Sequence, residues 1–200
     1  MTKTLYLMRH GQTVFNARHK IQGWCDSPLT ELGIAQAEQV AEYFQKEQIT
    51  FDHAYSSTAE RACDTLEIVT QNAMPYKRLK GLREWHFGVF EGESEDLNPP
   101  NEPGATSYGD AFVKFGGEGS LEVQARLDAT LREIMEQADH EQVLAVGHGG
   151  AMYMFIQKWE DFARVRQIRF SNCCILKFTY EAGEFQFVEA INHDFSTLGK

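Results

Sequence analysis

The sequence LYLMRHGQT, residues 5–13, predicts a buried strand that ends in a cation, an imidazole and a glycine. Residues 5–8 are apolar and too few for a helix, which is typical of a strand buried on both faces of a parallel sheet. Ligands collect beyond the carboxyl ends of such strands, so Arg9 and His10 are expected at the rim of a pocket. Arginine offers paired donors for phosphate or carboxylate, and a neutral histidine can attack phosphorus. Taken alone, however, Arg9 to Gly11 fit a strand end and a surface loop better than a site.

A second stretch repeats the pattern. An apolar strand predicted over 142–146 ends in Gly147-His148-Gly149-Gly150, and a helix is predicted to follow over 151–159. His148 would then lie at a strand end beside a helix N-terminus, where anions bind readily. Arg61 is expected in the first turn of a helix over 58–72, where a cation opposes the helix dipole, so its position indicates a nearby anion.

The order of the elements predicts an α/β fold. Strands expected over 5–8, 51–55, 76–79 and 142–146 alternate with helices over about 30–48, 58–72, 120–138 and 151–159. Strands over 172–180 and 185–191 read as a hairpin at the sheet edge. We therefore expect a three-layer α/β/α sandwich whose mostly parallel sheet has an antiparallel edge strand. In the helix over 120–138 the apolar residues predicted to face the core are Leu121, Leu127, Leu131, Ile134 and Met135.

The length and the turn residues predict one domain over 1–200 with one excursion. Two hundred residues suffice for one sizeable core. Residues 93–119, rich in proline and glycine, are expected to form a lid-like excursion with at most one short helix, around 108–115.

Charge and hydropathy exclude several classes of partner. The net charge of −10 would repel nucleic acid and anionic membranes, so any bound anion has to be gathered by a local cationic pocket. No apolar run approaches the ~20 residues of a membrane span. Residues 1–4 carry no signal-peptide pattern, which favours a cytoplasmic location.

Cysteine and histidine spacing predicts neither disulfides nor a metal. Cys25, Cys63, Cys173 and Cys174 show no CxxC pair and are expected as reduced thiols, mostly buried. No two of the seven histidines have HxxxH or HxH spacing, so no metal site is predicted. Five histidines are expected to be structural or exposed: His19, His53, His86, His140 and His193.

Several motifs together carry a family resemblance. They are RHGQT at 9–13, Asn16, IQGW at 21–24, SPLTELGIAQA at 27–37, YSSTAERACDT at 55–65, LREWHFGVFEG at 82–92 and GHGG at 147–150. Each is weak alone, but in this order and spacing they resemble the histidine phosphatase superfamily, also called phosphoglycerate mutase-like, over almost the whole chain.

The resemblance implies a covalent mechanism without a cofactor or metal. His10 would attack phosphorus and form a phosphohistidine, while Arg9, Arg61 and a protonated His148 would hold the equatorial oxygens. Glu84 would be the general acid for the leaving alkoxide. The resemblance also places substrate-binding roles on Asn16, Gln22, Gly23 and Gly149, and it implies a small phosphorylated metabolite as the partner.

Departures from the mutase pattern favour a phosphomonoesterase. Cofactor-dependent mutases follow the catalytic glutamate with an arginine and a tyrosine-glycine pair, where this chain has Trp85, Phe87 and Gly88. The 93–119 excursion has one lysine, Lys114, and no arginine, and it carries Glu93, Glu95, Asp96 and Glu102. A mutase and a non-catalytic protein that binds phosphorylated ligands are the alternatives.

Three further expectations remain open at this stage. Ser120 departs from the family's GGES pattern and is expected only as a helix cap. An aromatic wall against an organic leaving group or plain core packing would both suit Trp24, Trp85, Phe87, Phe90 and Phe115. The hairpin, if its edge is exposed, could pair across a homodimer.

Overall fold

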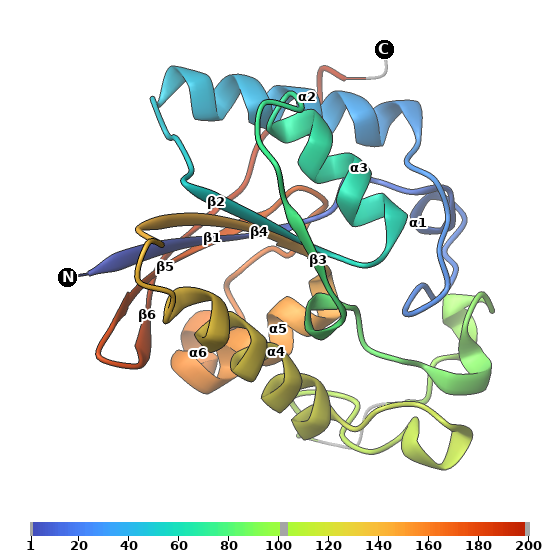
Figure 1. Cartoon of the computed structure of the whole chain (residues 1–200). Coiled ribbons are helices and arrows are strands. Elements are labelled where there is room, and N and C mark those ends of the chain that lie inside the picture. The colour runs from blue at the N-terminus through green and yellow to red at the C-terminus, as the bar shows by residue number, and fades with distance from the viewer. Residues whose placement is uncertain (1, 101–103, 199–200) are drawn as a thin grey trace.

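A six-stranded mixed sheet forms the centre of the molecule (Figure 1). The structure, a computed structural model, describes residues 2–100 and 104–198. In sheet order the strands are β3 (Lys77–Leu79), β2 (His53–Ser57), β4 (Gln142–Gly147), β1 (Lys3–Arg9), β5 (Ile175–Glu181) and β6 (Glu184–Ile191). The first four are mutually parallel, and β5 is antiparallel to both of its neighbours. The predicted antiparallel edge is therefore a hairpin, with β6 outermost.

Helices cover both faces of the sheet, which confirms the predicted sandwich (Figure 1). On one face lie α2 (Glu31–Lys46) and α3 (Glu60–Val69), and on the other α4 (Ser120–Met135), α5 (Gly149–Trp159) and α6 (Phe162–Val165). The short α1 (Val14–Ala17) lies beyond the carboxyl ends of the parallel strands. No helix of the described residues has the length and apolar character needed to span a membrane.

Strand β1 shows why the sheet is buried on both sides. Leu5 and Leu7 belong to the core cluster with α4 and α5, whereas Tyr6 and Met8 belong to the cluster with α2 and α3. Successive side chains of a strand point to opposite faces, so a continuous apolar run serves two cores at once. The described cysteines are free thiols, and of these Cys25 alone is only half-buried.

The inward face of α4 differs from the prediction at its first turn. Leu121 is 71% exposed, whereas Val123 is fully buried beside Leu127 and Leu131. Residue 121 lies two positions before 123, nearly opposite on a helix with 3.6 residues per turn.

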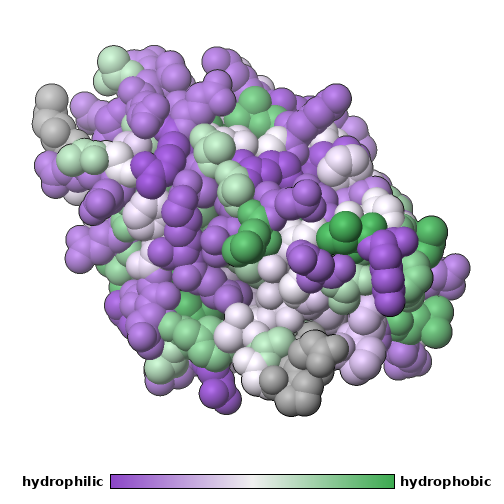
Figure 2. Space-filling view, turned by 90° about the horizontal axis from the view of Figure 1, so that it is seen from below, coloured by the Kyte–Doolittle hydropathy of each residue, from purple (hydrophilic) through white to green (hydrophobic). Residues whose placement is uncertain are grey.

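In Figure 2 the molecule is viewed from below, where hydrophobic residues appear as scattered spots on a largely hydrophilic surface.

The segment before α4 also corrects two expectations. Ser120 is the first residue of the helix rather than its cap, and the Glu122 carboxylate instead accepts the Gly119 N–H at 2.8 Å. The described part of residues 93–119 contains two short 3-10 helices, Glu95–Leu97 and Val113–Phe115, instead of at most one. Glu102 lies outside the described residues, and lid-like behaviour stays a prediction.

Candidate active site

Three neighbouring strands carry site residues to one end of the sheet. Arg9 ends β1 and is followed by His10, Gly147 ends β4 and is followed by His148, and Ser57 ends β2. These strands are adjacent and parallel, so their carboxyl ends meet at one edge. The topology thus brings together residues that are far apart in the sequence.

His10 is buried and its two ring nitrogens have distinct partners. Nδ1 lies 2.7 Å from the carbonyl oxygen of Gly11, which can only accept, so Nδ1 carries the proton. Arg61 donates from Nε to Nε2 at 3.3 Å. Burial, followed by the charges of Arg61 and Arg9, lowers the pKa of His10 well below its ordinary value. The ring is therefore neutral, with the Nε2 lone pair facing the guanidinium.

Arg61 is completely buried and is bound by its own chain. Its Nη1 donates to the Cys25 carbonyl at 2.9 Å and to the Asp26 carboxylate at 2.8 Å, and its Nη2 donates to the Gly23 carbonyl at 2.8 Å. The position of Arg61 in the first turn of α3 predicted a nearby anion, and the Asp26 carboxylate is such an anion. These contacts hold the guanidinium against His10 before any ligand arrives.

Glu91 holds the loop that in turn holds Arg61. Its carboxylate accepts backbone N–H groups from Gly23 at 3.1 Å, Trp24 at 2.8 Å, Cys25 at 2.9 Å and Phe87 at 3.0 Å. Although burial acts to raise the pKa of Glu91, hydrogen bonds from Cys25, Phe87 and Trp24 outweigh it and lower the pKa. Sequence reasoning missed this residue, although it lies within the LREWHFGVFEG motif.

His148 completes the pair of imidazoles. Its ring centroid is 5.2 Å from that of His10, its Nδ1 lies 3.0 Å from Nη2 of Arg61, and its Nε2 lies 2.8 Å from Ser57 Oγ. Arg61 can only donate, so the proton of His148 is on Nε2. Burial, then Arg61, His10 and Arg9, lower its pKa well below the ordinary value. His148 is therefore neutral among these protein groups, and its protonation during phosphoryl transfer stays a prediction. Ser57 is a partner that sequence reasoning missed.

Glu84 lies at the start of α5. Its Oε1 accepts from the backbone N–H groups of Trp85 at 2.8 Å and Ala151 at 2.7 Å, and its Oε2 accepts from that of Gly150 at 2.8 Å. A Cβ on Gly150 would come within 2.8 Å of Oε1, so the carboxylate needs glycine there. The first turn of a helix offers unpaired N–H groups, which explains why the Glu84 carboxylate binds at the GHGG stretch.

A cavity of about 190 Å³ is lined by both His10 and Glu84, whereas Arg61 and His148 lie buried behind it and are not part of its lining. Its lining includes five predicted site residues, namely Arg9, His10, Asn16, Gln22 and Glu84. Lys20, Glu95, Asn98 and Tyr108 add polar groups to the wall. A larger cavity of about 870 Å³ is also lined by Arg9, together with residues 169–172 and 192–196, but its lining includes neither His10 nor Glu84.

Several predicted binding residues have other contacts. The Asn16 Oδ1 accepts from the Thr13 N–H and from Asn172, each at 3.2 Å, which leaves only its Nδ2 to donate to a ligand. The Gln22 amide satisfies its neighbours when Nε2 faces Thr13 Oγ1 at 2.6 Å and Oε1 faces Arg61 Nε at 3.3 Å. Gly23 faces Arg61 rather than the cavity, and Gly149 packs against the Arg9 side chain.

The aromatic residues are divided between core and cavity. Phe87 lines the cavity, whereas Trp85 is buried in the core and Trp24 stacks on His86 with ring centroids 4.4 Å apart. An extended aromatic wall is therefore not formed by these residues, and core packing accounts for most of them.

Comparison with known proteins identifies the family. The family model for the histidine phosphatase superfamily (branch 1) matches residues 5–193. The chain belongs to that superfamily. The resemblance inferred from the motifs is thereby confirmed, and so is the phosphoglycerate mutase-like fold.

The relatives carry both mutase and phosphatase names. A protein of Proteus mirabilis named probable phosphoglycerate mutase GpmB is 35% identical over 188 residues, covering 88% of this chain and 85% of that protein. A broad-specificity phosphatase of Saccharomyces cerevisiae is 31% identical over 197 residues, covering 92% and 82%. A crystal structure of phosphoglycerate mutase from Bacillus anthracis aligns with a TM-score of 0.84 at 30% identity, covering 98% of this chain and 94% of that one.

Proposed function

We propose that this histidine phosphatase superfamily member is a phosphomonoesterase that works through a phosphohistidine on Nε2 of His10, needs no metal, and acts on a small phosphorylated metabolite. The observation that carries the proposal is the fixed, neutral tautomer of His10. Its Nδ1 proton is held by the Gly11 carbonyl, and its Nε2 lone pair lies at the guanidinium of Arg61. A nucleophile is thus in contact with a cation whose charge favours an adjacent phosphoryl anion, while the N–H groups of Arg61 have protein partners.

In the first step Nε2 of His10 attacks phosphorus and the bond from phosphorus to the ester oxygen breaks. Negative charge spreads over three equatorial oxygens, next to Arg9, Arg61 and His148. His148 is neutral among its protein neighbours, and an adjacent phosphate dianion favours its protonated form. We assign Glu84 the role of general acid, which passes a proton to the leaving oxygen, and the alcohol departs.

In the second step water attacks the phosphohistidine. The Glu84 carboxylate accepts a proton from that water, the bond between phosphorus and Nε2 breaks, and inorganic phosphate leaves. The backbone N–H groups of Trp85, Gly150 and Ala151 keep the carboxylate in place between the two steps.

The cavity favours hydrolysis over mutase chemistry. A mutase must hold a doubly phosphorylated intermediate, which requires cations on the leaving-group side of the cavity. Lys114, the basic residue of the 93–119 excursion, is exposed over the Phe115 ring, 4.9 Å from its centroid. Lys20 lines the cavity, but its Nζ donates to the Gly92 carbonyl at 2.8 Å, and the acidic Glu95 lies in the same wall.

A non-catalytic phosphate-binding role is the weaker alternative. Binding alone needs neither a neutral imidazole with an available lone pair nor a carboxylate held by three N–H donors. A carboxylate beside a phosphate site costs affinity for an anion unless it transfers a proton.

The test is hydrolysis of p-nitrophenyl phosphate by the purified chain with and without EDTA. We expect release of phosphate that EDTA does not abolish and that His10→Ala removes. With 3-phosphoglycerate we expect hydrolysis to exceed transfer. Mutase turnover faster than phosphate release would overturn the assignment to hydrolysis, and full activity of His10→Ala would overturn the mechanism.

A further inference from the structure

Two histidines outside the proposed active site lie against one carboxylate. His53 begins β2, and Asp139 and His140 lie in the connection between α4 and β4. The His53 and His140 rings stack with centroids 3.6 Å apart and planes 9° apart. His53 Nε2 lies 3.2 Å from Oδ2 of Asp139, and His140 Nδ1 lies 2.8 Å from Oδ1. Both rings therefore present a nitrogen to the same anionic group.

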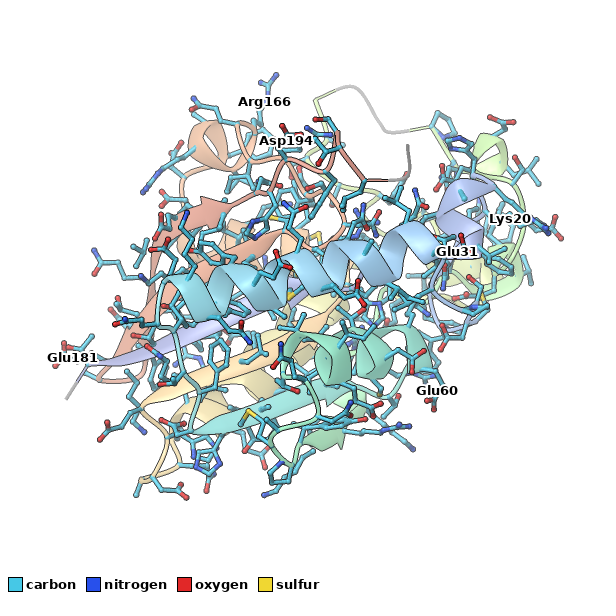
Figure 3. The ribbon with its side chains drawn as sticks, turned by 90° about the horizontal axis from the view of Figure 1, so that it is seen from above. Lys20, Glu31, Glu60, Arg166, Glu181 and Asp194 are labelled. Atoms are coloured by element: carbon cyan, nitrogen blue, oxygen red, sulfur yellow. The ribbon has the colours of Figure 1, made fainter. Side chains whose placement is uncertain are left out.

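This cluster is at the opposite end of the molecule from the cavity. His53 is at the amino end of β2 and His140 precedes the amino end of β4, whereas His10 and His148 follow carboxyl ends. In Figure 3 Lys20, which lines the cavity, and Glu181, which ends the antiparallel β5, lie at opposite ends of the sheet. The cluster is thus separate from the phosphoryl-transfer chemistry.

We propose that His53, Asp139 and His140 bind one divalent transition-metal ion of the kind that prefers imidazole, such as Zn²⁺. Their ligand atoms all lie within 4.8 Å of one another. A tetrahedral zinc ion with bonds of about 2.0–2.2 Å needs ligand atoms about 3.4 Å apart. Parallel stacked rings cannot both direct an in-plane lone pair at one ion, so binding requires the His53 ring to turn out of the stack. The His53 side chain is 33% exposed and that of Asp139 is 73% exposed, which leaves both of them room to move. A water would complete the coordination.

The partner of His140 on its other nitrogen suits metal binding. Tyr55 Oη lies 2.7 Å from Nε2 of His140. A hydroxyl can donate to Nε2 when the proton is on Nδ1, and can accept from Nε2 when Nδ1 binds a metal. Metal-bound histidines are usually held by such a contact on the second nitrogen. The unloaded and loaded tautomers of His140 are therefore both satisfied.

The surroundings are negative, which favours a cation. Asp139 is itself part of the cluster, and the carboxylate of Asp52 accepts the backbone N–H groups of Glu141 at 2.8 Å and Gln142 at 2.7 Å, directly after His140. No spacing rule finds this site, because 87 positions separate the two histidines, the difference between 140 and 53.

The test is titration of the untagged, reduced full chain with Zn²⁺ followed by calorimetry. We expect one zinc ion per chain, at least a tenfold loss of affinity in His53→Ala and in Asp139→Asn, and no loss in His19→Ala. His19 is the matched control because it is another histidine beside a carboxylate, 3.6 Å from Glu95. His140 is buried, so its role is tested through its partner Tyr55 rather than by mutating His140 itself. Tyr55→Phe is expected to lower zinc affinity about tenfold or more.

A second readout separates this site from the active-site imidazoles. Zinc is expected to raise the melting temperature of the wild type and of His10→Ala, but not that of His53→Ala. The proposal is overturned if His53→Ala binds zinc as tightly as the wild type, or if the high-affinity site is lost in His10→Ala instead. Failure of phosphatase activity alone would leave these zinc measurements unchanged.

Discussion

Arg61 donates from Nε to Nε2 of His10 at 3.3 Å, although 51 positions separate the two residues. The same guanidinium contacts Nδ1 of His148 at 3.0 Å, so one buried cation links both imidazoles. This arrangement keeps both rings neutral and fixes which nitrogen of each ring carries the proton.

Glu84→Gln should slow hydrolysis most for substrates whose leaving group needs a proton. General acid catalysis is worth about 10²–10⁴-fold, so we expect a loss in that range for an alkyl phosphate such as glycerol phosphate. For p-nitrophenyl phosphate the loss should be much smaller, because nitrophenolate leaves without protonation. Steady-state kcat/KM for the two substrates measures this, and equal losses on both would contradict a proton-donor role.

Glu91→Gln should disturb Arg61 without touching the cavity. One amide oxygen cannot replace two carboxylate oxygens that accept four backbone N–H groups, so about 1–3 kcal/mol of stability is expected to be lost. kcat should also fall, because the carbonyls of the 23–25 loop position Arg61. Glu93→Gln, at an exposed neighbour, is the control. Urea unfolding and turnover that are identical in both variants would refute this positioning role.

Stability should fall as the pH drops below the ordinary histidine value of 6.5. Because the pKa values of His10 and His148 are lowered in the folded state, the unfolded chain binds more protons below that value. The contribution of His10 and His148 to stability is retained above pH 6.5 and is lost as the pH falls toward their folded-state pKa values. Urea midpoints at about pH 7.5 and about pH 5 measure this. His148→Asn should reduce the difference, and an unchanged difference would argue against buried neutral imidazoles.

Two leucines of α4 provide a matched pair for core packing. Leu127 is 2% exposed and Leu121 is 71% exposed. Leu127→Ala should cost about 2–5 kcal/mol of unfolding free energy, whereas Leu121→Ala should stay within about 0.5 kcal/mol. Denaturant unfolding of both variants gives the comparison. A large loss in Leu121→Ala would mean that this side chain is covered in solution.

The fold was largely predictable because its signals are local. The apolar run 5–8 belongs to a strand that serves two cores, and Thr30 caps α2 by accepting the Gly33 N–H at 3.0 Å near the predicted start of that helix. Local signals failed where composition misleads. Leu121 is apolar but lies on the outer side of α4, and Ser120 is a good cap residue but follows a glycine that occupies the cap position.

The sequence motifs selected residues that the structure brings close together, but they did not predict the contacts of those residues. Motif order pointed to His10, Arg61, Glu84 and His148, yet their partners Ser57, Asp26 and Glu91 are common polar residues without a distinctive spacing. The neutral state of His148 depends on burial beside Arg61, which only the tertiary structure provides. The His53 and His140 pair was missed for the same reason, since strand order and not sequence spacing makes them neighbours.

The most direct test of the proposed mechanism is to trap the phosphoenzyme. Rapid mixing with p-nitrophenyl phosphate, quenching in alkali and peptide mass spectrometry should show one phosphoryl group per chain, stable to alkali and labile to acid, on the peptide that contains His10. Glu84→Gln should accumulate more of it, since water is then activated more slowly. Steady turnover with no phosphorylated histidine, or with the phosphoryl group on another residue, would contradict the account.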